Sequence, residues 1–222
     1  MSRDTDACGC DGFTSIFDRR TASADLERYR RDGPDRTTRM LLDMIESAGG
    51  VRGASILDIG AGVGAIDHES LRAGASHAVL VDGSLPYQQA AREEGRRRGH
   101  LDRMEFVDGD FVSLAPLVDR ADVVTLDRVI CCYPDVERLV SLSAAKAGSL
   151  YGLVLPRDRG ILRFGVRLIN LWFRLRRDPY RAFAHPNATV DAQVRAAGLR
   201  PTAEATTFVW RVVLYERPAA SS

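Results

Sequence analysis

A glycine-rich turn directly follows a buried strand near residue 60. Residues 56–65 read Ile-Leu-Asp-Ile-Gly-Ala-Gly-Val-Gly-Ala; the apolar residues predict a parallel strand, and the glycines permit a sharp turn and close approach of a ligand to the backbone. A second apolar run, residues 77–81, ends at Asp82 and Gly83, 24 residues after Asp58. An acid there can accept hydrogen bonds from both ribose hydroxyls of a nucleoside. The sequence therefore predicts a nucleotide site with Asp82 as its ribose anchor.

The glycine spacing fits two kinds of nucleotide cofactor. Gly60, Gly62 and Ala65 satisfy the small-residue pattern of NAD-binding folds. Those folds usually begin with this strand, whereas here 54 residues precede it and no second substrate domain follows. That layout, with the pattern acid-x-Gly-x-Gly-x-Gly at Asp58, Gly60, Gly62 and Gly64, resembles class I S-adenosylmethionine (SAM)-dependent methyltransferases. The resemblance implies SAM as cofactor; an NAD-binding oxidoreductase and a turn that binds nothing remain the alternatives.

Length and composition are those of one globular domain. The chain has 222 residues, 45% hydrophobic and 27% charged, enough to bury one large core. A net charge of +1 argues against general nucleic-acid affinity. Residues 1–11 are too polar for a signal peptide, and no apolar run is long enough to span a bilayer. We therefore expect a cytoplasmic protein whose four cysteines are reduced thiols.

Helix and strand patterns alternate along most of the chain. Residues 13–48 predict two helices separated at Gly33-Pro34, because proline disfavours helix at the residue before it. Seven strands are predicted, at residues 55–59, 77–81, 104–107, 122–126, 152–155, 202–208 and 211–215. Only a tight turn can join the last two, so they should pair antiparallel. The expected fold class is α/β: a Rossmann-like, doubly wound seven-stranded sheet, mostly parallel with an antiparallel C-terminal hairpin.

The predicted organisation places helices before and within the methyltransferase domain. Residues 1–50 form an N-terminal helical arm or cap, and residues 51–222 form the SAM-binding domain with a helical lid insertion at about 158–187. Ligands of open parallel sheets bind outside the carboxyl ends of the strands. The third strand ends at Asp110-Phe111, where the family places its adenine contacts, so Asp110 is assigned to the adenine amino group and Phe111 to the ring. The alternative is an acidic turn with a core phenylalanine.

The segment after the fourth strand narrows the resemblance. Asp127 ends this strand, where methyltransferases place residues that face both the methionine part of the cofactor and the substrate. No Asn-Pro-Pro-Tyr or Asp-Pro-Pro-Tyr follows, which argues against methylation of exocyclic nucleobase amines or glutamine amides. The segment 132–134, Cys-Tyr-Pro, the arginine-bearing helix 162–177, the segment 183–185, Phe-Ala-His, and the segment 208–210, Phe-Val-Trp, together resemble the magnesium-protoporphyrin IX O-methyltransferases.

That resemblance implies a substrate class and a reaction centre. The family has His-Tyr-Pro where this chain has Cys132-Tyr133-Pro134, so the histidine implicated in its methyl transfer is Cys132 here. Cys132 and Tyr133 are therefore catalytic candidates, and the acceptor is expected to be a small molecule, large and anionic, methylated on a carboxylate oxygen. Transfer from a sulfonium is an in-line displacement that the protein promotes by alignment and exclusion of water. An ionised carboxylate needs no general base.

Few other side chains are candidates for acid–base chemistry. Three histidines fall on a helix or at strand starts, where we expect a solvated surface position: His68, His77 and His100. His185 lies in the insertion expected to cover the pocket and is the candidate substrate contact or base. Tyr29 and Arg39 lie on the N-terminal helices expected to cap the cofactor. Tyr29 is thus a further catalytic candidate and Arg39 a cofactor ligand, with plain packing or surface positions as alternatives.

Residues 162–177 predict a strongly amphipathic helix. At 100° per residue, the polar side chains other than Arg176 fall in a stripe roughly 80° wide: Arg163, Arg167, Asn170, Arg174 and Arg177. The remaining arc is apolar and too wide to bury easily against one sheet face. Four uses stay open: a buried lid with a solvated arginine edge, a substrate wall, a dimer contact or a contact with a membrane surface.

The cysteines form two pairs, Cys8 with Cys10 and Cys131 with Cys132. An N-terminal arm folded over the pocket would bring the pairs together, but their spacing is not that of paired C-x-x-C knuckles, and adjacent cysteines are awkward joint ligands. No metal site is therefore predicted. One other function class remains open: a methyltransferase-like fold that serves as a non-enzymatic SAM-binding or assembly module.

Overall fold

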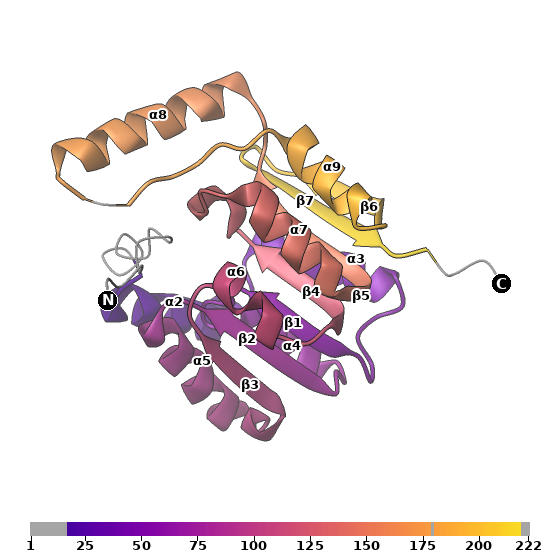
Figure 1. Cartoon of the computed structure of the whole chain (residues 1–222). Coiled ribbons are helices and arrows are strands. Elements are labelled where there is room, and N and C mark those ends of the chain that lie inside the picture. Colours follow the sequence, from indigo (N-terminus) through magenta and orange to yellow (C-terminus); the bar gives the residue numbers. More distant parts are fainter. Residues whose placement is uncertain (1–16, 179, 219–222) are drawn as a thin grey trace, which may run out of the picture.

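The computed structural model describes residues 17–178 and 180–218, except the side chain of Arg163. Its centre is one seven-stranded sheet in the order β3-β2-β1-β4-β5-β7-β6 (Figure 1). The strands are β1 Ser55–Ile59, β2 His77–Asp82, β3 Met104–Asp108, β4 Ala121–Asp127, β5 Ala147–Pro156, β6 Arg200–Thr206 and β7 Trp210–Glu216. Strands β1 to β5 are parallel, and β7 is antiparallel to both β5 and β6. The predicted fold class is confirmed.

Helices cover both faces of this sheet. The longer ones are α2 Arg19–Asp32, α3 Arg36–Ser47, α4 Ala65–Arg72, α5 Leu85–Arg98, α7 Val136–Lys146, α8 Gly160–Leu175 and α9 Asn187–Ala196; the short ones are α6 Phe111–Leu114, η2 Leu101–Arg103, η3 Ala115–Leu117 and η4 Ile130–Cys132. One buried apolar cluster joins α3, α4 and α5 to the sheet. A second joins α6, α7 and α9 to the opposite face. Strand β1 contributes to both clusters because successive side chains point to opposite faces.

The break between the two N-terminal helices and the end of the second lie where the sequence predicts. Within the described residues the first of them begins at Arg19, and its predicted start at residue 13 lies outside those residues. Asp18 accepts a hydrogen bond from the Thr21 N–H and starts α2, and Asp35 accepts from the Thr38 N–H and starts α3. Such acceptors satisfy backbone donors that a helix leaves unpaired at its N-terminus. Gly33, at φ 74°, separates the two helices. Helix α2 does not reach the sheet; it packs on α5 through a small apolar cluster.

Helix α8 differs from every other long helix in the described part of the chain. It stands apart from the sheet and its layers (Figure 1), and most of its large apolar side chains are exposed. The interpretation of residues 162–177 as a well-buried lid with a solvated arginine edge is therefore wrong, because no element that the structure describes covers the apolar arc. Among the residues that the structure describes, no helix is both long and apolar enough to cross a membrane.

Candidate functional site

A cavity of about 830 Å³ opens at the carboxyl ends of β1 to β4, below the junction of α2 and α3. Strand order reverses between β1 and β4, which is where open α/β sheets bind ligands. Twelve of the fourteen predicted site residues line it: Tyr29, Arg39, Asp58, Gly60, Gly62, Asp82, Gly83, Asp110, Phe111, Asp127, Cys132 and Tyr133. Gly64 and His185 do not.

The glycine turn has the conformation that its sequence requires. Gly60, Gly62 and Gly64 all have positive φ, at 71°, 58° and 74°, which other residues adopt only with strain. A Cβ atom at Gly60 would collide with the side chain of Val129. The Asp82 carboxylate holds the turn from the end of β2, because its Oδ2 accepts from the Gly62 N–H at 2.9 Å. Burial raises the pKa of Asp82, and the hydrogen bonds from the Gly62 and Ser84 N–H groups oppose this rise.

Two buried carboxyls meet behind the turn. Asp58 is 2% exposed and accepts a 2.6 Å hydrogen bond from the Thr125 hydroxyl. Asp67 has no exposed surface, and no donor among the described residues reaches its carboxyl oxygens. Burial and the facing Asp67 carboxyl raise the pKa of Asp58 well above its ordinary value, while burial raises the pKa of Asp67 to about 7. A proton shared by the pair removes the repulsion that two buried carboxylates would otherwise suffer.

Asp110 connects two of the loops that line the cavity. Its carboxylate caps α6 by accepting from the backbone of Val112 and Ser113, and it accepts a 2.9 Å hydrogen bond from the Tyr133 hydroxyl. Burial raises the pKa of Tyr133, and the hydrogen bond to Asp110 raises it further. Phe111 is 3% exposed and belongs to the apolar core. The acidic turn with a core phenylalanine is therefore present, and both residues also line the cavity.

Asp127 is held by residues that the sequence analysis missed. The Thr38 hydroxyl donates to its Oδ2 at 2.5 Å, and the Arg128 guanidinium pairs with it at 2.9 Å and also with Asp35. Arg128 has φ 63°, in the left-handed region. Its position directly after a candidate acid at the end of a strand was the only available signal in the sequence. These contacts tie the start of α3 to the end of β4.

The Cys131–Tyr133 loop is tied to the segment that returns from α8. The Cys132 thiol lies 3.0 Å from the Tyr180 hydroxyl, the Phe183 N–H donates to the Cys131 carbonyl at 2.7 Å, and His185 Nε2 lies 2.9 Å from the Tyr133 carbonyl oxygen. The His185 ring thus binds the backbone outside the cavity. Hydrogen bonds from the Cys131 thiol and then from Tyr180 lower the pKa of Cys132 to about 7, against the effect of burial.

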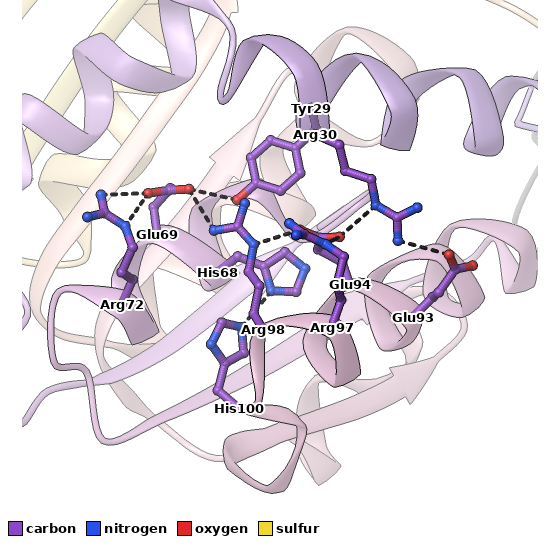
Figure 2. A network of polar contacts seen from close by, with 10 residues as sticks. All are labelled: Tyr29, Arg30, His68, Glu69, Arg72, Glu93, Glu94, Arg97, Arg98 and His100. Carbon is purple, nitrogen blue, oxygen red and sulfur yellow. Dashed lines mark hydrogen bonds and ion pairs between the residues drawn. The ribbon is translucent and has the colours of Figure 1, made fainter.

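Tyr29 and Arg39 line the cavity with their polar groups engaged elsewhere. The Tyr29 hydroxyl donates to Glu69 at 2.8 Å (Figure 2). The Arg39 guanidinium donates to the carbonyl oxygens of Pro34 at 2.6 Å and Asp32 at 2.9 Å. Both residues therefore hold the α2–α3 cap in place.

The prediction that His68 and His100 are solvated is wrong. His68 has no exposed surface and His100 is 5% exposed, with His68 Nδ1 2.9 Å from His100 Nε2 (Figure 2). Helix α2 causes this burial, since the Tyr29 ring stacks on His68. Burial, followed by the charges of His100 and Arg98, lowers the pKa of His68 to about 3. The side chain of His77 remains 42% exposed, as predicted.

Further cavity residues come from segments that carry no motif. The Tyr87 hydroxyl donates to Asp25 at 2.5 Å, and Phe17 packs edge-on against Tyr87. Acids greatly outnumber bases in the lining: Asp25, Asp32, Asp35, Asp58, Asp82, Asp108, Asp110 and Asp127 against Arg28, Arg39 and Arg128. These acids favour the positively charged groups of a ligand, and the Cys131–Tyr133 part of the lining contributes none of them.

The structure adds little on metal binding. Within residues 17–178 and 180–218 no three His, Cys, Asp or Glu side chains are grouped so as to hold a metal ion. Cys131 and Cys132 are free thiols with their sulfurs 3.7 Å apart. Cys8 and Cys10 lie outside the described residues, so the suggested meeting of the two pairs stays a prediction.

Comparison with known proteins gives one family match. Residues 57–144 match the family model of a methyltransferase domain. No curated protein matches the chain. The matched segment runs from β1 to α7 and contains the glycine turn, Asp82, Asp110 and Asp127.

Several solved structures with the same fold are methyltransferases. Magnesium protoporphyrin IX methyltransferase from Synechocystis PCC 6803, with bound SAH, is 20% identical, covers 94% of this chain and 100% of its own, and has a TM-score of 0.70. An O-methyltransferase family protein from Burkholderia thailandensis is 18% identical over 94% of this chain and 64% of its own, with a TM-score of 0.66. An O-methyltransferase family 2 protein from Planctomyces limnophilus, in complex with apigenin, is 17% identical over 88% and 66%, with a TM-score of 0.59.

Proposed function

We propose that this protein, a class I SAM-dependent methyltransferase, transfers its methyl group to a carboxylate oxygen of a bulky, anionic small molecule. One observation supports this acceptor best: the cavity lining described above contains neither histidine nor lysine. Each tyrosine hydroxyl in the lining already donates to a carboxylate. A phenol or an amine needs a base to remove its proton, whereas a carboxylate is ionised at neutral pH.

The cavity residues suit SAM, the cofactor of this family. SAM bears sulfonium and ammonium charges and, when bound, supplies the electrophilic methyl group. The acidic lining matches those charges, and the Gly60–Gly64 turn leaves room for a ligand beside the backbone. In this proposal Asp82 and Gly83 hold the ribose, Asp110 and Phe111 the adenine, and the turn the methionine part. Asp58, Asp127 and Arg39 shape the same end of the cavity, and Tyr29 closes it from above.

The acceptor side of the cavity is formed by the Cys131–Tyr133 loop and the segment returning from α8. Cys132 stands where the magnesium-protoporphyrin enzymes have histidine, and its thiol, which has a pKa of about 7, contacts the Tyr180 hydroxyl of the returning segment. We assign Cys132 and Tyr133 to acceptor positioning. The similar enzyme from Synechocystis is named for magnesium protoporphyrin IX, which supports a large carboxylic acid as acceptor here.

The test is the chemistry of the product. The protein is incubated with methyl-labelled SAM and a panel of large carboxylic acids, including protoporphyrin IX and its magnesium chelate. Methyl esters release methanol in mild alkali, whereas ethers and N-methyl groups do not. Alkali-labile label supports the proposal, and alkali-stable label on a phenol or amine contradicts it.

Cofactor binding is checked separately by calorimetric titration. Asp82→Ala should weaken SAM binding at least about tenfold because two ribose hydrogen bonds are lost. Asp102→Ala, an exposed aspartate on η2 outside the cavity, is the matched control and should bind as the wild type does. Equal affinity in the two variants would contradict the ribose assignment.

A further inference from the structure

The outer surface of α8 is a wide apolar face. Seven of its large side chains are between 47% and 77% exposed: Ile161, Phe164, Leu168, Ile169, Leu171, Trp172 and Leu175. At 100° per residue they occupy one side of the helix about 160° wide. Soluble monomers rarely expose so many large apolar groups together. We call these seven side chains the α8 apolar face.

Contacts on the opposite side of α8 fix its orientation. Asn170 exchanges two hydrogen bonds with the backbone of Ala182, at 2.8 and 2.9 Å. The Phe173 ring packs edge-on against Tyr180, with centroids 5.1 Å apart. The returning segment thus occupies the inner side of the helix. The α8 apolar face is therefore directed away from the returning segment.

The charge around this face is strongly positive. Residues 159–177 contain six arginines and no acidic residue. Because the whole chain has a net charge of +1, removing these six leaves −5 for the remainder. Arg167 and Arg174 are exposed and flank the apolar face, and no ion pair holds either of them in the described part of the chain. The Arg176 guanidinium lies 4.1 Å from the Trp172 ring centre.

We propose that α8 binds the surface of an anionic lipid bilayer, with its apolar face among the upper acyl chains and its arginines at the lipid phosphates. A basic amphipathic helix with Trp, Phe and Leu on one side is suited to that interface. The anionic surface attracts the arginines of α8 and repels the rest of the chain, whose net charge is −5. A symmetric dimer through α8 would instead set two arginine-rich helices side by side. The charge therefore favours lipid over a second copy.

Both ends of α8 lead directly to the cavity. On the entry side, the Arg157 N–H donates to the Val209 carbonyl at 2.8 Å, next to Trp210, which lines the cavity. On the return side, Tyr180 contacts Cys132. Phe208, at the exposed turn between β6 and β7, is 68% exposed and adds an apolar side chain near the entry. A bilayer that holds α8 thus lies close to the acceptor side of the cavity.

A bilayer next to the cavity favours one class of acceptor, an acid held in the membrane. This point alone rests on the proposed function. An acid with a large apolar body and an ionised carboxylate partitions into the bilayer interface with the carboxylate at the water side. Such an acceptor reaches the cavity without leaving the membrane surface. The lipid contact of α8 itself is independent of which acid is methylated.

The experiment is flotation of the full chain with vesicles, which requires no acceptor and no turnover. Vesicles of phosphatidylglycerol and phosphatidylcholine in equal parts are compared with phosphatidylcholine alone, at low and high salt. The wild type should float with the anionic vesicles only and be released by salt. Trp172 fluorescence should shift to shorter wavelength on binding, and Trp172→Phe should abolish that shift.

Two variants and a matched control decide the role of the helix. The double variant Leu168→Glu/Leu171→Glu should lose at least about tenfold in vesicle affinity, and Arg167→Gln/Arg174→Gln should lose both affinity and salt dependence. Leu117→Glu changes a leucine that is 81% exposed on η3 and should bind as the wild type does. SAM affinity should be the same in all of them, which separates this result from any failure of the proposed reaction.

Three outcomes would overturn the proposal. One is absence of vesicle binding by the wild type at low salt. Another is equal binding by the wild type and the Leu168→Glu/Leu171→Glu variant. The third is a wild-type dimer in sedimentation velocity that the same leucine variant converts to monomer while vesicle binding is unchanged, because the α8 apolar face would then be occupied by a second copy.

Discussion

Two arginine-rich parts of this molecule have opposite surroundings. At the end of α5, Arg97 and Arg98, with Arg30 of α2, converge on the side chain of Glu94, which has no exposed surface (Figure 2). Around α8 the arginines have no acidic residue between positions 159 and 177. The first group covers a buried histidine pair, and the second flanks an exposed apolar face. Arginine content alone therefore predicts neither structure nor binding.

The acids nearby decide what each group of arginines does. Glu69 and Glu94 neutralise the guanidinium groups of the network and fix α2 over α4 and α5. Burial alone would raise the pKa of Glu94, but hydrogen bonds from Arg97, Arg98 and Arg30 lower it below its ordinary value. No such partner restrains Arg167 or Arg174 among the described residues, so their charge remains available to a ligand. One group stabilises the fold, and the other faces solvent.

Among the changes to polar contacts, the largest effect is expected from Glu94→Gln. This change removes the charge that three arginines share, so the free energy of unfolding should fall by about 3 kcal/mol, measured by urea denaturation. Glu93→Gln is the matched control, since the Glu93 side chain is 63% exposed and, among the described residues, pairs with Arg30 alone. Its cost should stay under about 0.5 kcal/mol. Equal costs would show that the network is no more than a set of surface pairs.

The second prediction concerns acid stability and His68. Burial keeps its pKa at about 3 in the folded state, below the ~6.5 of an unfolded histidine, so the unfolded chain takes up the proton first as the pH falls. The stability that the neutral imidazole contributes is complete above pH ~6.5 and is lost progressively toward pH ~3; the loss reaches about 2 kcal/mol at pH ~5. Unfolding of His68→Gln should depend less on pH between ~7.5 and ~5 than unfolding of the wild type.

The control for this prediction is His77→Gln. The His77 side chain is 42% exposed, so its replacement should leave the pH dependence of unfolding unchanged. The same pH dependence in the wild type and in His68→Gln would contradict the burial of a neutral imidazole beside α2.

A third, smaller effect separates a structural from a catalytic Tyr29. Tyr29→Phe removes one hydrogen bond to Glu69 but keeps the ring on His68, so the unfolding free energy should fall by about 1 kcal/mol. The turnover number at saturating substrate should change little, because the hydroxyl is engaged away from the cavity. Loss of turnover with unchanged stability would restore Tyr29 as a catalytic residue.

The smallest effect on stability is expected in α8. Leu171→Glu should change the unfolding free energy by less than about 0.5 kcal/mol, because this side chain is 53% exposed. Leu41→Ala, at a leucine of α3 with no exposed surface, should cost about 2–5 kcal/mol. A large cost at Leu171 would mean that α8 packs against the body of the protein in solution.

Much of the cofactor side of the site follows from local sequence. The Asp58–Gly64 motif and the acids at the ends of β2, β3 and β4 were predicted because strand ends in a parallel sheet meet at one edge. Thr38 and Arg128, which hold Asp127, were not predicted, since their contacts join segments about ninety residues apart. Asp67 was not predicted either, because nothing in the sequence around a single acid on a helix indicates that it will face another buried carboxyl.

By itself the sequence determined the order of strands and helices, the antiparallel C-terminal hairpin and the glycine turn, because period-two and period-3.6 patterns and glycine conformations are local properties. Only the tertiary structure decided which amphipathic surfaces are covered. His68 became buried because α2 packs over α4 and α5, and the α8 apolar face stayed exposed because no element of residues 17–178 and 180–218 packs on it. Burial depends on contacts between distant segments, and no local pattern specifies those contacts.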